Sequence, residues 1–180
     1  MSDLLFPPHL ISPSVQKALP KGYHMRPLSS SDYEKGFLEA LSHLTDVGTP
    51  TKASFIERFA YLKAHNHEYF TLVIEHTERQ KVVAAGTIFV ERKFIRGNGL
   101  VGHIEDIVVH ESARGLQFGR YIIEALKYVG ASTSCYKIIL DCSEKNVPFY
   151  VKCGFKQKEI EMAWYIPKEA DRAPPLLSKL

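Results

Sequence analysis

The stretch that decides the fold runs from Val101 to Phe155 and reads VGHIEDIVVHESARGLQFGRYIIEALKYVGASTSCYKIILDCSEKNVPFYVKCGF. An apolar strand leads into a glycine-containing loop, and that loop opens an amphipathic helix. A second strand follows and ends in Asp141, before a short helix that carries Tyr150. A strand, a helix and a second strand in this order predict a βαβ unit whose two strands are parallel.

The rest of the chain extends this unit into a larger sheet. Hydrophobic periodicity and turn signals predict helices over 37–44, 51–64, 116–129 and 147–153, and strands over 23–28, 69–76, 82–95, 100–109, 136–142 and 155–165. The helix over 116–129 should end at Gly130. The strand over 136–142 is almost entirely apolar, which is typical of a strand buried on both faces. Short turns make the three strands from 69 to 109 antiparallel. We therefore predict an α/β fold with a mixed central sheet and helices on both faces.

Two helices have apolar stripes that should face the core. The predicted core residues are Phe55, Ile56, Phe59 and Leu62 in the first and Phe118, Ile122, Ala125, Leu126 and Val129 in the second.

The composition is that of an ordinary globular protein. The chain has 180 residues, of which 45% are hydrophobic and 24% charged, with a formal charge of +3. These values predict one main domain over 22–166, an N-terminal arm over 1–21 and a C-terminal tail over 167–180. The positive charges are dispersed, so we expect no nucleic-acid binding. No stretch is apolar enough to span a bilayer, so we expect no membrane insertion.

The three cysteines, Cys135, Cys142 and Cys153, have no paired spacing. An odd number of cysteines favours a reducing compartment over a disulfide scaffold. We expect no metal site, because no recognised pattern of ligand spacing occurs. Ser178-Lys179-Leu180 matches a peroxisomal address, so we expect a cytoplasmic protein with a possible peroxisomal fraction.

The loop Arg114-Gly115-Leu116-Gln117-Phe118-Gly119 is a candidate phosphate site. A turn between a strand and a helix directs free backbone N–H groups and the helix dipole at an anion. Many such turns only connect a strand to a helix, so the loop alone does not establish a phosphate site. The loop contains neither GxGxxG nor GK[ST], and it follows antiparallel strands, which is unlike a Rossmann fold or a P-loop protein.

In this layout the chain resembles the GNAT superfamily of acetyl-CoA-dependent N-acetyltransferases. The pyrophosphate loop of that superfamily reads Gln/Arg-x-x-Gly-x-Gly/Ala, and here Gln117 replaces the first glycine. Within the superfamily, the chain is most similar to the eukaryotic glucosamine 6-phosphate N-acetyltransferases. The matching segments are Val47-Gly48, Glu91-Arg92-Lys93, GHIEDI at 102–107, CYKIILDC at 135–142, EKNV at 144–147, Phe149-Tyr150 and KCGF at 152–155, and the resemblance extends over 22–165.

The resemblance implies binding sites for acetyl-CoA and a sugar phosphate. Acetyl-CoA would contact Ile107, Val108, Val109, Arg114, Gly115, Leu116, Gln117, Phe118, Gly119, Arg120, Asn146, Phe149, Tyr150 and Lys152. The sugar phosphate would contact Thr45, Lys93, Arg96, Glu105, Asp106, Tyr136, Lys137 and Asp141. In the family, the two parallel strands splay apart to admit the pantetheine arm, and a bulge in the first frees an N–H for the thioester carbonyl. The last strand often ends in a basic residue that reaches the phosphate, but Tyr165 occupies that place here; Lys168 or Arg172 in the tail could replace it.

Acetyl transfer needs a neutral amine and a stabilised thiolate, and four residues suit those tasks. Asp141 follows a strand and can accept the proton of the amine, although it could instead cap the next turn. Tyr150 can donate to the departing CoA thiolate, although it could simply be a core aromatic. Glu105 and Asp106 are adjacent, so only one faces the substrate, and the other is structural, unless a bulge intervenes. Cys142 would be a bystander, since the amine attacks directly in the family.

We therefore predict an acetyl-CoA-dependent acetyltransferase that acts on D-glucosamine 6-phosphate, as a homodimer. One alternative is a GNAT enzyme with another amine acceptor, such as a protein or a polyamine. A second alternative is a non-catalytic acyl-CoA-binding module. Lys93, Arg96 and Lys137 favour a phosphorylated acceptor if they converge, although each could equally be a solvated surface residue.

Overall fold

A computed structural model describes residues 3–166 of the chain. The helices and strands are α1 (Pro13–Ala18), β1 (Tyr23–Pro27), α2 (Phe37–Ser42), α3 (Lys52–Ala64), β2 (Tyr69–His76), β3 (Lys81–Arg92), α4 (Ile95–Asn98), β4 (Leu100–Val109), α5 (Phe118–Ser132), β5 (Cys135–Ile139) and α6 (Val147–Lys152). Short 3-10 turns occur at Pro8–Leu10, Ser30–Tyr33, Glu111–Ala113 and Glu144–Asn146.

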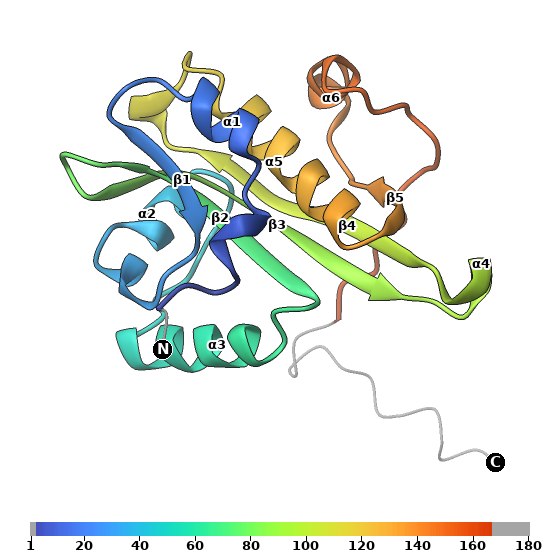
Figure 1. Ribbon diagram of the computed structural model, residues 1–180, viewed down its shortest axis with the longest axis horizontal. Coiled ribbons are helices and arrows are strands. Elements are labelled where there is room, and N and C mark those ends of the chain that lie inside the picture. The colour runs from blue at the N-terminus through green and yellow to red at the C-terminus, as the bar shows by residue number, and fades with distance from the viewer. Residues whose placement is uncertain (1–2, 167–180) are drawn as a thin grey trace.

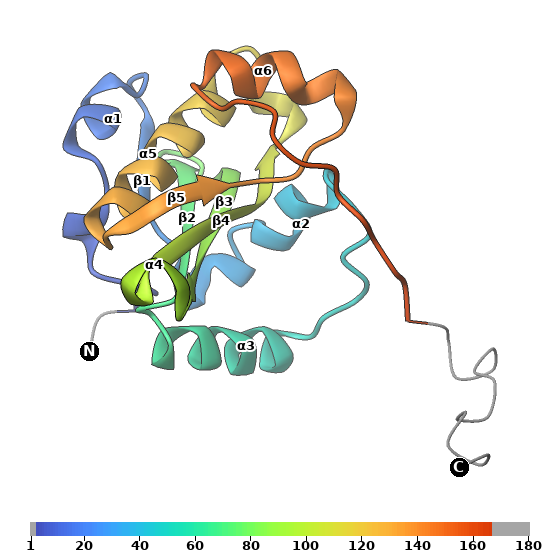
Figure 2. The same cartoon turned by 90° about the vertical axis from the view of Figure 1, so that its right-hand side faces the viewer.

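The described strands form one five-stranded sheet in the order β1-β2-β3-β4-β5. The first three pairings are antiparallel and the β4–β5 pairing is parallel. The antiparallel order of β2, β3 and β4 and the parallel β4–β5 pair agree with the prediction. Figure 1 and Figure 2 show α1 and α5 on one face of the sheet and α2 and α3 on the other. The prediction of a mixed sheet with helices on both faces is confirmed.

The core lies mainly between the sheet and α5. The predicted face of α5 is confirmed, since Phe118, Ile122, Ala125, Leu126 and Val129 are all at most 1% exposed. Each large apolar side chain buried in this way contributes about 1.5–3 kcal/mol. The α5 helix approaches β3 so closely that a Cβ on Gly86 would lie 2.5 Å from Ile122 Cγ2.

Residues of the N-terminal arm also enter the core. Leu5 and Phe6 are 0% and 2% exposed, and the Phe6 ring contacts Phe70 of β2 edge-to-face at 5.3 Å. The arm is therefore part of the hydrophobic core. The predicted boundary between the arm and the main domain at residue 21 stays a prediction.

A buried ion-pair network joins β1 and β2 to the turn that follows β1. Arg26 donates to both oxygens of Asp32, at 2.8 and 2.7 Å, and to Glu75 at 2.8 Å. Lys35 also donates to Glu75 at 2.8 Å. Asp32 is fully buried and caps the turn by accepting from the Ser29 backbone N–H at 2.7 Å. The network fixes the far edge of the sheet.

Several predictions about individual elements are wrong. The strand β5 is half-buried to exposed, because it is an edge strand that α5 covers on one face only. The helix α5 continues through Gly130 to Ser132, since Gly130 packs against Ile138 and is needed for that close approach. Ile56 is 37% exposed and lies outside the buried face of α3. Residues 155–166 form no strand; they extend away from the sheet (Figure 2).

Candidate active site

A β-bulge in β4 presents two neighbouring carboxylates to the same side. Between Ala85 and Thr87 of β3 there is only Gly86, whereas the paired residues Val108 and Glu105 of β4 enclose two residues. Asp106, one of these two, has a φ of +54°, which is the left-handed region. The extra residue breaks the alternation of side chains, so Glu105 and Asp106 line the same cavity. The exception for a bulge, stated with the prediction, therefore applies.

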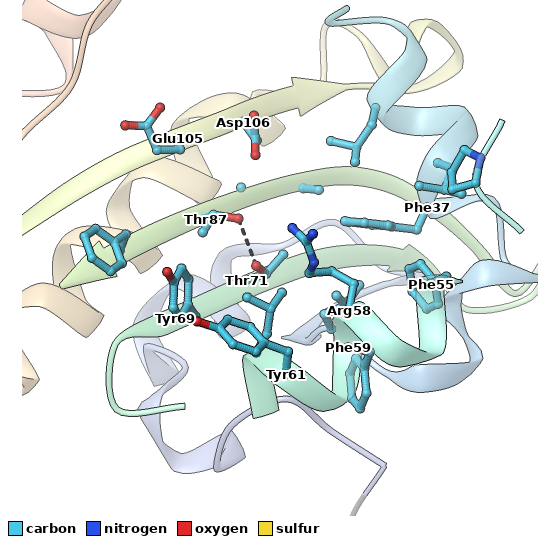
Figure 3. A pocket seen from close by; sticks show the side chains of 18 of the residues that line it. Phe37, Phe55, Arg58, Phe59, Tyr61, Tyr69, Thr71, Thr87, Glu105 and Asp106 are labelled. Carbon is cyan, nitrogen blue, oxygen red and sulfur yellow. Dashed lines mark hydrogen bonds between the residues drawn. The ribbon is translucent and has the colours of Figure 1, made fainter. Parts of the chain in front are cut away.

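This cavity, of about 1020 Å³, lies between the sheet and the two helices α2 and α3. Figure 3 shows Thr71, Thr87 and the two carboxylates on the sheet side, with aromatic side chains and Arg58 from α3 opposite. The Thr71 and Thr87 hydroxyls bond each other at 2.9 Å. The lining is thus largely apolar, with the carboxylates of Glu105 and Asp106 on β4 and that of Glu57 beside Arg58 on α3.

Electrostatics connects Asp141 to this acidic pair. Burial raises the pKa of Glu105, and the negative charges of Asp106 and Asp141 raise it further. Glu161 acts in the same direction, whereas His103 opposes it. A carboxyl with a raised pKa keeps its proton to a higher pH and is a better acid or base near neutrality. Asp141 therefore lies close enough to Glu105 for its charge to act on it, although Asp141 is not part of the cavity lining.

The gap between the two parallel strands lies beside the bulge. The β4–β5 ladder ends at the pair His103 and Ile139, although β4 continues to Val109. The separation leaves the second half of β4 without a neighbour on that side within the described residues. An extended thioester arm fits there, next to the unpaired residue of the bulge. Ile107 and Val109 at this edge are half-buried, and Val108 is 5% exposed.

The loop after β4 has the geometry of an anion site. Gly115 has a φ of +87°, and a Cβ there would meet no atom within 4 Å. Gln117 is the N-cap of α5 and makes no side-chain cap, so the first N–H groups of the helix are free to bind an anion. Gln117 itself has a φ of +60°, a conformation that favours glycine. The chain thus keeps, at an energetic cost, the backbone that glycine adopts easily.

Two exposed arginines and the α6 helix flank this loop. Arg114, Leu116 and Arg120 are exposed, Phe118 is buried in the core, and Gly119 faces α6. A Cβ on Gly119 would lie 3.4 Å from Phe149 Cζ. The α6 helix therefore borders the start of α5. The other α6 candidates, Asn146 and Lys152, are exposed at its two ends. The residues present fit a pyrophosphate with its pantetheine arm.

Tyr150 lies on α6 near Cys142. Its ring is half-buried and contacts Phe149 at 5.0 Å and Phe155 at 6.2 Å. Burial raises the pKa of Tyr150, and the nearby Cys142 and Cys153 raise it further through electrostatic repulsion. The phenol is therefore protonated at neutral pH, and its hydroxyl has no hydrogen-bond partner within residues 3–166. It is available as a donor.

The predicted phosphate-binding residues do not gather in the cavity. Lys93 already donates to Glu91 at 2.7 Å, and His103 shares the same carboxylate at 2.9 Å. These contacts hold the pKa of Glu91 below its usual value, through the Lys93 hydrogen bond first. The remaining candidates are exposed and outside the cavity lining: Thr45, Arg96, Tyr136 and Lys137. Their roles stay predictions.

Sequence reasoning missed the wall opposite the carboxylates. Arg58, Tyr61 and Tyr69 line the cavity from α3 and β2. The signal was present in α3, because Arg58 follows Phe55 by three residues and precedes Leu62 by four, which places all three on one helix face.

The cysteines and acidic groups of residues 3–166 form no disulfide and no cluster that could hold a metal ion. Cys135, Cys142 and Cys153 are free thiols. No cluster of three or more potential metal ligands occurs within residues 3–166. In the same range, no helix has the length and apolar character needed to cross a membrane.

Comparison with known proteins agrees with this geometry. A sequence model of the Acetyltransferase (GNAT) family matches residues 32–155. The glucosamine 6-phosphate N-acetyltransferase 1 of Dictyostelium discoideum is 49% identical over 146 residues, which cover 81% of this chain and 92% of that protein. The Arabidopsis thaliana glucosamine 6-phosphate N-acetyltransferase is 41% identical, over 79% of this chain and 96% of the relative. A crystal structure of the Arabidopsis enzyme superimposes with a TM-score of 0.79, covering 81% of this chain and 99% of that one.

The matched segment contains the bulged strand, the helix-opening loop and the helix that carries Tyr150. A family match over most of the chain, together with relatives of this identity, leaves no other family to consider: the chain belongs to the GNAT family of acetyltransferases.

Proposed function

We propose that this protein transfers the acetyl group of acetyl-CoA to the amine of D-glucosamine 6-phosphate, which gives N-acetyl-D-glucosamine 6-phosphate and CoA. The observation that carries the acceptor is the relationship to proteins with that activity in their names, at 49, 41 and 44% identity over about four fifths of this chain. The bulged β4 and its carboxylates support the chemistry independently. A bound acetyl-CoA supplies the acetyl group as a thioester.

The reaction needs two proton transfers, one from the amine and one to the sulfur of CoA, and different residues carry out each. The acidic group of Glu105, Asp106 and Asp141 orients the amine and accepts its proton as the C–N bond forms. The bulge in β4 directs a backbone N–H at the thioester carbonyl. Tyr150 donates its phenolic proton to the sulfur as the C–S bond breaks. Free N–H groups at the start of α5, with Arg114 and Arg120, hold the pyrophosphate.

We propose a homodimer that covers the C-terminal segment. Met162 and Trp164 are 90% and 81% exposed, on a segment that leaves the body of the protein. Large apolar side chains so exposed favour contact with another surface. The edge of β5 lacks a partner strand among the described residues, and a strand from a second copy could pair there. Light scattering after size exclusion measures the mass directly, and a monomer at micromolar concentration contradicts the dimer.

The cellular location stays a prediction. We propose the cytoplasm, with a peroxisomal fraction if Ser178-Lys179-Leu180 is read as an address; this tripeptide lies outside the described residues. Imaging of the full chain, with and without the tripeptide, tests this.

The activity is tested by CoA-thiol release from acetyl-CoA with D-glucosamine 6-phosphate, unphosphorylated glucosamine or a lysine peptide. We expect release with the sugar phosphate, and a decrease of about 10- to 100-fold for Tyr150→Phe, which removes one hydrogen bond to a charged sulfur. Release with the peptide alone would assign another acceptor. Binding of acetyl-CoA without any release would indicate a binding module.

A further inference from the structure

Arg58 lies on the wall of the cavity opposite Glu105 and Asp106, and its neighbour Glu57 lines the same wall. It comes from the middle of α3, and Figure 3 shows its guanidinium pointing away from the helix, towards the strands that carry Thr71 and Thr87. Phe55 and Phe59, which flank it on the helix, are both less than 9% exposed. The backbone of Arg58 is thus held by well-packed neighbours, and its side chain extends into the cavity.

This guanidinium has no partner among the residues that the structure describes. No hydrogen bond or ion pair joins Arg58 to any residue within 3–166, whereas Arg26 and Lys93 are both engaged by carboxylates. The charged neighbours that shift the pKa of Glu105 do not include Arg58. The cation and the acidic residues therefore occupy separate parts of one cavity.

The guanidinium of Arg58 and the two carboxylates of β4 lie in different parts of the cavity, so an acceptor with opposite charges at its two ends complements them. An amino sugar phosphate carries an ammonium group near one end and a phosphate at the other. The acidic residues suit the amine. A guanidinium suits the phosphate, because its planar fork can donate two parallel hydrogen bonds to two phosphate oxygens. The aromatic lining reduces competition from water, which strengthens the charge-assisted hydrogen bonds.

We propose that Arg58 recognises the phosphate of the acceptor and sets the preference for a phosphorylated over an unphosphorylated amino sugar. The inference rests on the proposed function. It also accounts for a missing positive charge, because Tyr165 occupies the position at which the family resemblance implies a basic residue. Arg58 supplies that positive charge from α3 of the same chain, while Lys93 remains paired with Glu91.

The test compares kcat/KM for D-glucosamine 6-phosphate and for glucosamine in the full chain and in Arg58→Ala, Arg58→Lys and Lys63→Ala. Lys63 is a matched control, because it is a cation of the same helix that is absent from the cavity lining. We expect Arg58→Ala to lower kcat/KM for the sugar phosphate by about 10- to 100-fold, the range for a lost hydrogen bond to a charged group. Glucosamine should lose less than about threefold, Arg58→Lys should fall between, and Lys63→Ala should match wild type.

Inhibition by inorganic phosphate gives a second readout that needs no phosphorylated acceptor. With glucosamine as acceptor, Arg58→Ala should need at least about tenfold more phosphate than wild type for equal inhibition. Equal losses with both sugars, or unchanged preference in Arg58→Ala, overturn the role of Arg58 while leaving the proposed function intact. A wild type that does not prefer the phosphorylated sugar overturns the proposed function, and the role of Arg58 with it. Arg58 is exposed, and circular dichroism of each variant verifies the fold.

Discussion

Gly86 is the residue on which the bulge in β4 depends. It faces the two bulge residues across the β3–β4 ladder and packs under α5. In Gly86→Ala, the new Cβ would lie 2.5 Å from Ile122 Cγ2 and 2.6 Å from Ile107 Cδ1, which is too close for carbon atoms that are not bonded to each other. Ile122 is fully buried and both contacts must be relieved, so α5 must shift and Ile107 must move at the bulge.

The cost should be that of overpacking a core, about 1–3 kcal/mol in the free energy of unfolding. For a chain of this size, such a loss lowers the Tm by roughly 2–12 °C. Because the relief includes movement of Ile107, next to Asp106, kcat/KM for acetyl transfer should also fall. Calorimetry and urea unfolding measure the first effect, and CoA release the second.

A compensating substitution supplies the control. Ile107→Val removes the Cδ1 atom, so the double variant Gly86→Ala/Ile107→Val should regain part of the stability, with a coupling of about 0.5–1.5 kcal/mol in a double-mutant cycle. A Gly86→Ala protein with wild-type stability, or additive effects in the cycle, would refute the close packing of β3, the bulge and α5.

Three further substitutions test separate parts of the structure. Gln117→Gly should change the free energy of unfolding by less than about 0.5 kcal/mol, because relief of the left-handed conformation offsets the entropy of glycine. Gln117→Val should lower it by about 1–2 kcal/mol in urea unfolding. Equal losses in the two variants would contradict the positive φ at residue 117. Arg26→Met leaves the buried carboxylate of Asp32 without its partner and should cost about 3–5 kcal/mol by the same method, and a loss below about 1 kcal/mol would contradict the network. Asp141→Asn removes a negative charge near Glu105, so the raised pKa of Glu105 should fall, while burial keeps it above its ordinary value. NMR titration measures this pKa. An unchanged value would show that the charge of Asp141 does not act on Glu105.

The sheet and its two parallel strands could be predicted because local signals agreed with the fold. The apolar runs and turns in 69–109 and the apolar stripe of α5 both depend on neighbours in sequence. The burial of β5 could not be predicted in the same way. Its apolar composition matches a strand with cover on both faces, yet the described chain covers one face only, and composition alone does not say which element provides the rest.

The site shows the same division between local and long-range information. The loop at Arg114–Gly119 was recognised from its residues, including the glycine position that Gln117 occupies with a positive φ. Asp106 and Glu105 share a face only because a bulge forms opposite Gly86, which depends on the register between two strands. Arg58 shares a helix face with Phe55 and Leu62, but its place across the cavity from Glu105 and Asp106 depends on how α3 packs against the sheet.

The most direct test of the proposed activity is a competition in one reaction. The protein is given acetyl-CoA with a 13C-labelled acetyl group and equal concentrations of D-glucosamine 6-phosphate, glucosamine and a lysine peptide, and mass spectrometry follows the label. We predict that the label enters the sugar phosphate in large excess over the other two acceptors. Label found mainly on the peptide, or shared equally among the three, would contradict the assignment of the acceptor.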